Sequence, residues 1–485
     1  MHLLLMHLNQ MDMLSGMTKL RGNPWAVLAT LSLGFFMTLL DMTIVNIAIP
    51  DVMRSLHADL DQVMWVISGY ALVLAALVVT AARLGDMKGQ RNLFATGIAL
   101  FTLASAACGL ATGPAVLITA RAVQGLGAAL LVPQTMAMIV ATFPAARRGT
   151  ALGVWGSIAG LATLSGPTLG GLLVSVAGWR WVFFINIPIG LLVLALTYCW
   201  VPDLRTGRTH RLDLTGMLLS TAALTLFTFA VMEGNRYSWN AWIWALAAAG
   251  AALGAIFLRH QARRQNAEPL IPFALFTNRD FTLMTALMAT IGAVLIGAIV
   301  PLGLFLQQQL GLSPLHAGLA LAPSPLISLA VSPLAGRLSD RIGGRRVLLA
   351  GLLPFAIGLT AATLLTHDGA HPLTFTVPLM FMGLGTGCMI APLSTEAMRH
   401  VPPHLAGAAA GINNTARQLG SALGAAATTA LLSLGDSPLT GIHLAMTLPI
   451  ALLAAAALGL AATGSRAAAP APHTPTRRAE HRTSR

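Results

Sequence analysis

The chain has 485 residues, of which 56% are hydrophobic and only 9% are charged. Soluble domains carry about 25% charged residues, so this chain has too few polar side chains to cover a core in water. The formal net charge of +13 would suit nucleic acid, but the basic residues lie in short clusters between apolar runs, as in membrane proteins. The composition indicates an all-α integral membrane protein that contacts lipid and no nucleic acid.

Fourteen apolar runs are each long enough for a membrane-spanning helix, which needs about 20 residues. They lie near 26–49, 63–82, 92–112, 115–140, 149–173, 182–201, 213–232, 239–258, 282–304, 316–336, 347–366, 373–393, 407–431 and 441–462. An even number of spans places both termini on the same side of the membrane.

The basic residues predict which side this is. Of the 29 Lys and Arg residues, twenty-four fall in the termini and in the loops on the same side as the termini. Three fall in the opposite loops, and the remaining two, Arg121 and Arg417, lie inside spans. Cytoplasmic loops hold the excess of Lys and Arg, so we expect a multi-pass protein of the cytoplasmic membrane with both termini in the cytoplasm.

The two ends of the chain differ from the spans. Residues 1–22 lack the positive start and the cleavage site of a signal peptide, and are interpreted as a cytoplasmic leader in which Met17 is an alternative start. Residues 465–485 are rich in Ala, Pro, Thr and Arg, and are predicted to form a disordered basic cytoplasmic tail.

A loop sequence occurs twice, at an offset of 254 residues. Residues 83–91 read RLGDMKGQR after the second span, and residues 337–345 read RLSDRIGGR after the tenth. Such a repeat indicates a duplicated helical unit with a substrate site between its halves. Each loop is predicted to be a tight hairpin whose Asp accepts hydrogen bonds from a neighbouring helix start and whose basic residues pair across the halves. The residues concerned are Asp86, Gly89, Arg91, Gly336, Asp340, Gly343 and Arg345.

These loops resemble the signature loop of the major facilitator superfamily, G-x-L-a-D-r-x-G-r-k. Four further segments resemble the fourteen-helix drug:proton antiporters of that superfamily, and a fifth, 268–272 (EPLIP), precedes the ninth span. The four are 40–50 (LDMTIVNIAIP), 121–127 (RAVQGLG), 166–171 (GPTLGG) and 178–188 (GWRWVFFINIP). The resemblance implies a major facilitator fold with two six-helix bundles, 23–202 and 266–464. Two extra helices are expected between the bundles, in 203–265.

Asp41 is the carboxylate placed deepest in a predicted span, where charge is costly and usually functional. Asp41 lies roughly 13 Å from the outer end of its span and Arg121 roughly 9 Å from the outer end of its own, so the two are expected to pair. Gln124, one turn on, extends this network, while Asn46 is a hydrogen-bond partner for Asp41. We interpret Asp41 as the proton carrier, and a static ion pair that joins two helices is the alternative.

Two further spans carry patterned polar or small residues. Gly166, Pro167, Gly170 and Gly171 continue a glycine face that permits close packing and a kink. Asn413 and Arg417 share a helix face, and either line the cavity or form structural hydrogen bonds.

The resemblance implies proton-coupled efflux of small amphipathic or cationic drug-like molecules by a monomer. The sequence has no P-loop and no H-E-x-x-H or G-x-S-x-G motif, so we expect neither ATP-driven transport nor an enzyme. Cofactors and metals are not expected, with the proton gradient as the driving force. The alternatives are a dedicated exporter of one self-made antibiotic or metabolite, a proton-coupled uptake transporter, and a membrane enzyme or sensor.

Overall fold

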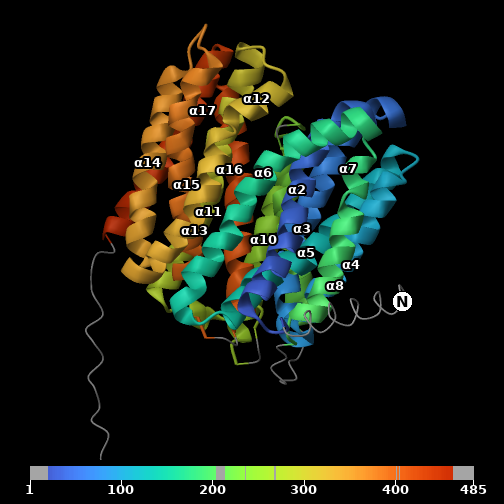
Figure 1. Cartoon of the computed structure of the whole chain (residues 1–485), viewed down its shortest axis with the longest axis vertical. Helices are drawn as coiled ribbons and strands as arrows, with labels where there is room; N and C mark the ends of the chain where they lie inside the picture. Colours follow the sequence, from blue (N-terminus) through green and yellow to red (C-terminus); the bar gives the residue numbers. More distant parts are fainter. Residues whose placement is uncertain are drawn as a thin grey trace, which may run out of the picture.

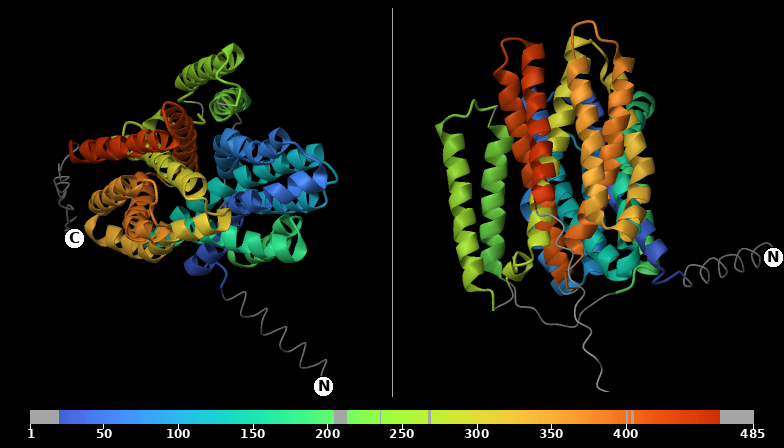
Figure 2. Two further views of the ribbon diagram at one scale, coloured as in Figure 1. Left: turned by 90° about the horizontal axis from the view of Figure 1, so that it is seen from above. Right: turned by 90° about the vertical axis from the view of Figure 1, so that its left-hand side faces the viewer.

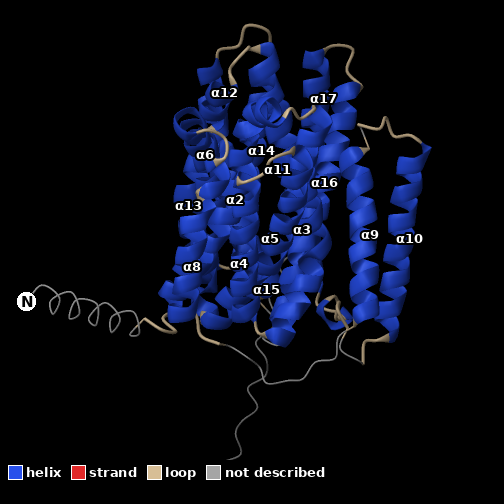
Figure 3. Ribbon diagram, turned by 90° about the vertical axis from the view of Figure 1, so that its right-hand side faces the viewer, coloured by secondary structure: helices blue, strands red, loops and turns tan. Residues whose placement is uncertain are grey.

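The computed structural model describes residues 20–203, 213–234, 236–266, 269–399, 401–402 and 405–462, and every regular element in these ranges is helical (Figure 3). The long helices are α2 (Pro24–Leu56), α3 (Leu60–Lys88), α4 (Gln90–Gly109), α5 (Pro114–Thr142), α6 (Arg148–Ala177), α8 (Asn186–Trp200), α9 (Leu214–Glu233), α10 (Ala241–Arg263), α11 (Arg279–Leu304), α13 (Pro323–Ile342), α14 (Gly344–Leu365), α15 (Thr376–Met398), α16 (Ala406–Ser433) and α17 (Pro438–Ala462). The short ones are α7 (Trp181–Phe184), α12 (Pro314–Leu321), η1 (Ala145–Arg147), η2 (Phe273–Leu275), η3 (Phe305–Gln309) and η4 (Pro372–Phe375). Most of the predicted leader, all of the predicted tail and Glu268 lie outside the described residues.

Local sequence signals set the first helix ends. α2 begins at Pro24, and the side chain of Asn23 accepts a hydrogen bond from Trp25 N at 2.9 Å. α3 begins with a capping box, in which Asp59 accepts from Gln62 N and the Gln62 side chain accepts from Asp59 N. These caps satisfy helix-start N–H groups that would otherwise lack a partner.

Twelve helices in the described part of the chain are long and apolar enough to cross a membrane. The runs near 149–173 and 407–431 form α6 and α16, of 30 and 28 residues, but these two are not among the twelve. α16 carries Asn413, Asn414 and Arg417, which lower its hydropathy, and the unbroken described apolar stretch of α6 is Thr168–Ala177, which is shorter than a span. The prediction of fourteen spans is therefore confirmed for twelve.

The helices form two bundles that stand side by side (Figure 1). Helices α2 to α8 pack around cores that include Phe94 and Phe183, and helices α11 to α17 pack around a separate core that includes Phe305 and Phe355. α9 and α10 pack on each other outside the two bundles, and α9 contacts α3 and α16 (Figure 2).

The bundles meet at the end of the molecule where the two repeated loops lie, which we call the basic end. There α6 packs on α13 and α3 packs on α16. The core of the first bundle also takes in Met398, Ala406 and Ala409 from the second. Gly22 N donates to Trp200 O at 2.9 Å, so the start of α2 and the end of α8 lie at this end too.

Candidate functional site

Asp41 lies in the middle of α2, and its side chain is completely buried. Its Oδ1 accepts hydrogen bonds from Gln124 Nε2 at 2.9 Å and from Asn186 Nδ2 at 3.0 Å. Its Oδ2 forms an ion pair with Nη1 of Arg121. A buried carboxylate needs such donors because it has lost its hydration. Donors from α5 and α8 thus replace water around a charge that α2 carries into the bundle.

Arg121, on α5, is 1% exposed and is held on several sides. Besides its ion pair with Asp41, its Nη1 donates to Gln124 Oε1 at 2.8 Å and its Nε donates to Val66 O at 3.0 Å. Its guanidinium carbon lies 4.4 Å from the centroid of the Tyr70 ring, a cation–π contact. The predicted pairing of Asp41 with Arg121 and Gln124 is present, and the cluster that it forms has no net charge.

This cluster links four helices through one carboxylate. Asp41 comes from α2, Val66 and Tyr70 from α3, Arg121 and Gln124 from α5, and Asn186 from α8. A proton on Asp41 would remove the charge that Arg121 neutralises and would weaken every bond to the carboxylate. Protonation would therefore be coupled to the packing of these helices, around a carboxylate that is completely buried in this conformation.

Asn186 is a donor to Asp41 that was not predicted from the sequence, although it lies in the segment 178–188. Its Nδ2 also lies 3.0 Å from Ser105 Oγ, and Ser105 in turn donates to Phe183 O at 2.9 Å. Asn186 occupies the first position of α8 and is fully buried. The signal available in the sequence was a lone amide at the start of an apolar run.

The prediction that Asn46 belongs to the Asp41 network is wrong. Asn46 is exposed and its Nδ2 donates to Met42 O at 3.3 Å, within its own helix. Five residues at 100° each place Asn46 about 140° around the helix from Asp41, so the two side chains face different neighbours. The hydroxyl of Thr43 likewise donates within its own helix, to Leu40 O at 2.9 Å.

The polar strip of α16 divides into two parts. Asn413 is 1% exposed, and its Oδ1 accepts from Thr285 Oγ1 of α11 at 2.8 Å, which is a structural contact within the second bundle. Arg417 is half-buried, and its Nη2 donates to Asn414 Oδ1 at 3.1 Å.

The glycines of α6 pack on two different helices. A Cβ at Gly153 would lie 2.6 Å from Ser332 O of α13, in the other bundle. Cβ atoms at Gly166 and Gly170 would lie 2.2 Å from Thr43 Oγ1 and 2.9 Å from Ile44 Cγ1, both on α2. α6 therefore joins the contact between the bundles to the helix that carries Asp41.

Gly171, in the predicted antiporter segment, lies apart from this packing. Gly171 has open space around it, so it does not continue the close-packed face as predicted. A kink was predicted at Pro167, and residue 167 lies within the single helix α6.

The second repeated loop binds the start of α6. Asp340 accepts hydrogen bonds from Gly149 N, Thr150 N and Thr150 Oγ1, each at 2.8 Å. A carboxylate is favoured here because a helix start presents free N–H groups and a positive dipole end. A Cβ at Gly336 would lie 2.2 Å from Gly149 O, so this crossing needs glycine. The prediction that Asp340 binds a neighbouring helix start is confirmed, and the bond joins the two bundles.

The first repeated loop has a different contact. Asp86 lies against Gly407 at the start of α16, where an added Cβ would be 1.9 Å from its Oδ1. Gly89 and Gly343 have φ of 93° and 90°, which glycine adopts without strain, at the junctions of α3 with α4 and of α13 with α14.

One arginine of each repeated loop contacts a helix of its own bundle. Arg91 donates to Tyr198 O of α8 at 3.2 Å, and Arg345 donates to Leu460 O of α17. Each arginine thus satisfies a carbonyl at the end of the last helix of its own bundle, as basic groups at helix C-termini do. These contacts lie within single bundles, and pairing of the loop arginines across the halves stays a prediction.

A further polar cluster lies at the basic end, where α9 begins and α10 ends. Asp213, which caps α9, accepts from Gly216 N at 3.0 Å and from Gln261 Nε2 at 2.8 Å, and it is hydrogen-bonded to His260 Nε2 at 2.9 Å. Burial raises the pKa of Asp213, but the hydrogen bonds from His260, Gly216 and Gln261 outweigh it and leave the pKa below the ordinary 3.8. Gln261 Oε1 accepts from Leu270 N at 2.7 Å, which ties the segment after α10 to the cluster.

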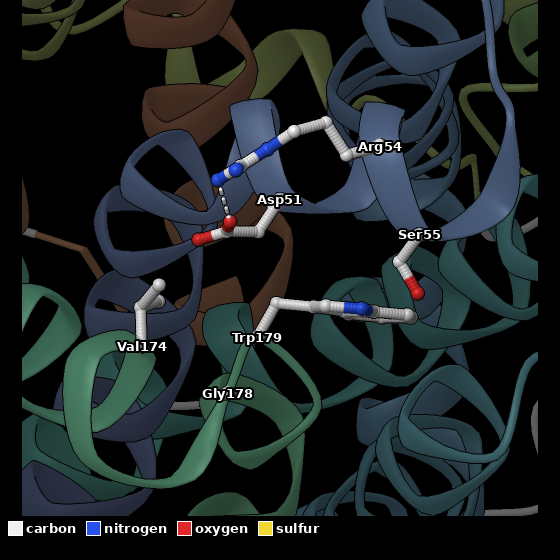
Figure 4. Close-up of a pocket in the computed structure, with 6 residues that line it drawn as sticks. All are labelled: Asp51, Arg54, Ser55, Val174, Gly178 and Trp179. Carbon is white, nitrogen blue, oxygen red and sulfur yellow. Dashed lines mark hydrogen bonds and ion pairs between the residues drawn. The ribbon is translucent and has the colours of Figure 1, made fainter.

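An open pocket of about 360 Å³ lies at the end opposite the basic end, between α2 and α6 (Figure 4). Figure 4 shows Arg54 and Asp51 paired on one side and Trp179 on the other. The pocket is lined by the end of α2 and the end of α6, and not by the buried Asp41 cluster.

The fold and the buried charge cluster define a membrane transporter: two helical bundles joined at one end, with an ion pair inside the apolar region. A family model described as Major Facilitator Superfamily matches residues 31–425 and also 281–484. The chain belongs to the major facilitator superfamily, whose members are transporters and not enzymes.

Known relatives agree with this membership. The chain is 38% identical to the Multidrug resistance protein Stp of Mycobacterium tuberculosis, over 86% of this chain and 77% of Stp. It is 33% identical to the Tetracenomycin C resistance and export protein of Streptomyces glaucescens, over 85% of this chain and 77% of that protein. The solved structure of the human organic anion transporter MFSD10 (TETRAN) matches with a TM-score of 0.65 at 14% identity, over 89% of this chain and 99% of that chain, which shows the shared fold.

Proposed function

We propose that the protein exports small drug-like or antibiotic molecules across the cytoplasmic membrane in exchange for protons. Relatives that are 38% and 33% identical bear the names of a multidrug resistance protein and of an antibiotic resistance and export protein. The observation that carries the proton coupling is the completely buried Asp41, held by Arg121, Gln124 and Asn186. Buried carboxylates at this depth are costly and characteristic of proton relays.

The proposed membrane arrangement extends the described helices. All fourteen long helices span, α6 and α16 included, because both lie inside the bundles and are long enough to cross. The bundles correspond to 23–202 and 266–464, and α9 and α10 in 203–265 are the two extra helices. The basic end faces the cytoplasm, since it carries the excess of Lys and Arg.

Transport follows from alternating access between the two bundles. In this conformation the basic end is closed by α6 on α13, with Asp340 bound to Gly149 and Thr150, and by α3 on α16. To receive substrate from the cytoplasm, the protein breaks these contacts. Because α6 also packs on α2 through Gly166 and Gly170, movement at the basic end is transmitted to the helix that carries Asp41. The proton gradient drives this cycle in a monomer, without a cofactor.

Two other readings remain as alternatives to broad export. A dedicated exporter of one self-made antibiotic is favoured by the name of the Tetracenomycin C relative. Proton-coupled uptake uses the same fold, so the direction of transport has to be measured.

Everted membrane vesicles that contain the full chain test the direction. Respiration acidifies their lumen, and a panel of cationic, neutral and anionic fluorescent amphiphiles is added outside. An exporter accumulates at least one compound in the lumen, and collapse of the pH gradient releases it. Asp41→Asn vesicles are expected to lose this accumulation. Gradient-driven loss of a preloaded compound from the lumen would indicate uptake, and no movement of any compound would contradict proton-coupled export.

A further inference from the structure

Arg417 is a charge inside the second bundle that no carboxylate neutralises. It lies 11 residues into α16, a helix of 28 residues, and therefore near the middle of the span. Among the described residues, its hydrogen-bond partner is the neutral amide of Asn414, at 3.1 Å. None of the ion pairs found in that part of the chain includes it. An arginine cannot lose its proton to escape this situation.

The position of α16 indicates where the guanidinium points. α16 packs on α11 and α17 of its own bundle and on α3 and α5 of the first, so it lies between the two bundles. Arg417 is half-buried, unlike the sealed Arg121. A guanidinium at this depth is too costly to face lipid, so the exposed part of Arg417 is expected to face the first bundle, on which α16 also packs.

The remaining charges at this depth do not compensate Arg417. Asp41 is neutralised by Arg121 within the first bundle and is completely buried. Glu396 lies near the end of α15, where it accepts from Gly344 N at 2.6 Å and pairs with Arg399 at 3.1 Å. Among the described residues, Arg417 is therefore a guanidinium without a neutralising carboxylate, which repels organic cations and favours an anion.

We infer that Arg417 binds the acidic group of the transported molecule, so that the substrates are amphipathic organic acids with a carboxylate, sulfonate or phenolate. This inference rests on the proposed export function and specifies the substrate class. The planar guanidinium offers two parallel N–H donors to such a group, and Asn414 holds it from one side. This substrate class differs from the amphipathic or cationic molecules that the resemblance implied.

Three probes that share one apolar body and differ in the charge of the head group test this. They are pyrenebutyrate, pyrenebutanol and pyrenebutyltrimethylammonium, which are anionic, neutral and cationic. Binding is measured by pyrene fluorescence on the full chain in nanodiscs, and transport is measured in proteoliposomes under an imposed pH gradient. The variants are Arg417→Gln, Arg417→Lys and, as a matched loss of one exposed arginine, Arg259→Gln on α10. Monodispersity and thermal unfolding establish that each variant is folded.

Wild type and Arg259→Gln are expected to bind the anion more tightly than the neutral probe. Arg417→Gln should lose about tenfold to a hundredfold in affinity for the anion alone, and Arg417→Lys, which keeps the charge but not the paired donors, should lose less than Arg417→Gln. If Arg417→Gln weakens the anionic and neutral probes equally, or if wild type prefers the cation, the inference is overturned. Binding of the anion that depends on Arg417, without transport of any probe, would keep the inference and contradict the proposed export. Gradient-driven transport of the cation but not of the anion would keep export and overturn the inference.

Discussion

The two bundles treat their buried charges differently. In the first bundle, Asp41 and Arg121 neutralise each other, and both are sealed from solvent. In the second bundle, the carboxylates of Asp340 and Glu396 bind helix starts at the basic end, and the middle of α16 carries Arg417 with a neutral partner. The repeated loops indicate a duplication, yet the two halves differ in their polar residues. The first half holds the buried Asp41–Arg121 pair. The second holds the unneutralised Arg417 and the Asp340 carboxylate that binds the start of α6, a contact we call the clasp.

The largest effect is expected from the loss of Arg121. Arg121→Gln leaves Asp41 buried without a cation, which costs about 3–5 kcal/mol of stability. Arg417→Gln breaks no ion pair and should cost far less. Thermal unfolding in detergent measures both, and the double variant with Asp41→Asn should recover part of the loss. Equal losses for the two arginines would contradict the distinction between a sealed and an open charge.

The clasp between the bundles is expected to give the next largest effect. Asp340→Asn weakens the charge-assisted bonds to Gly149 and Thr150, and should favour opening of the basic end by about 1–3 kcal/mol. Maleimide labelling of a cysteine placed at Ser332, which is 2% exposed at the α6–α13 contact, reports the opening. The same substitution at Asp86 serves as the comparison, and an identical labelling rate in wild type and Asp340→Asn would refute the clasp.

Asn186 and Asn46 are a matched pair of amides, of which Asn186 belongs to the Asp41 cluster and Asn46 does not. Asn186→Leu removes a donor to Asp41 and should lower gradient-driven transport about tenfold. Asn46→Leu, whose amide bonds within its own helix, should leave coupling intact. The proton-to-substrate ratio of both variants in proteoliposomes gives the answer, and a greater loss of coupling at Asn46 would show that the boundary is misplaced.

The smallest effect is expected outside both bundles, at Asp213. Its pKa is lower when folded than the ordinary 3.8, so its contribution to stability is complete above that pH and is lost as the pH falls through the lower folded value. Asp213→Asn should cost about 1 kcal/mol near neutral pH. Thermal unfolding followed from neutral to acid pH should show wild type converging on the variant. If wild type stayed more stable than Asp213→Asn by the same amount down to the most acid pH, the Asp213 charge would not be the source of the added stability.

Contacts that depend on how far a residue lies along its helix were predicted from the sequence. Contacts that depend on which way a helix face points were missed. Counting residues from the helix ends placed Asp41 level with Arg121, and the structure joins them. The same count does not show which face of α8 turns inward, so Asn186 was missed. Helical periodicity would have removed Asn46, which lies about 140° from Asp41.

The fold, like the Asp41 cluster, was predicted in part from the sequence. Runs of apolar residues marked every long helix, and twelve helices of the described part of the chain are long and apolar enough to cross a membrane. The hydropathy of α16 is lowered by Asn413, Asn414 and Arg417. The carbonyls that Arg91 and Arg345 bind belong to helices distant in sequence, α8 and α17. Loop sequences alone could not identify those partners.

The measurement that tests the central claim most directly is proton movement coupled to substrate. Proteoliposomes that hold the full chain and a pH-sensitive dye receive a compound that wild type transports. Wild type should change the lumenal pH in step with substrate, whereas folded Asp41→Asn should bind the compound and move no protons. Unchanged proton movement by Asp41→Asn would show that Asp41 is a structural ion-pair partner and that the proton travels elsewhere.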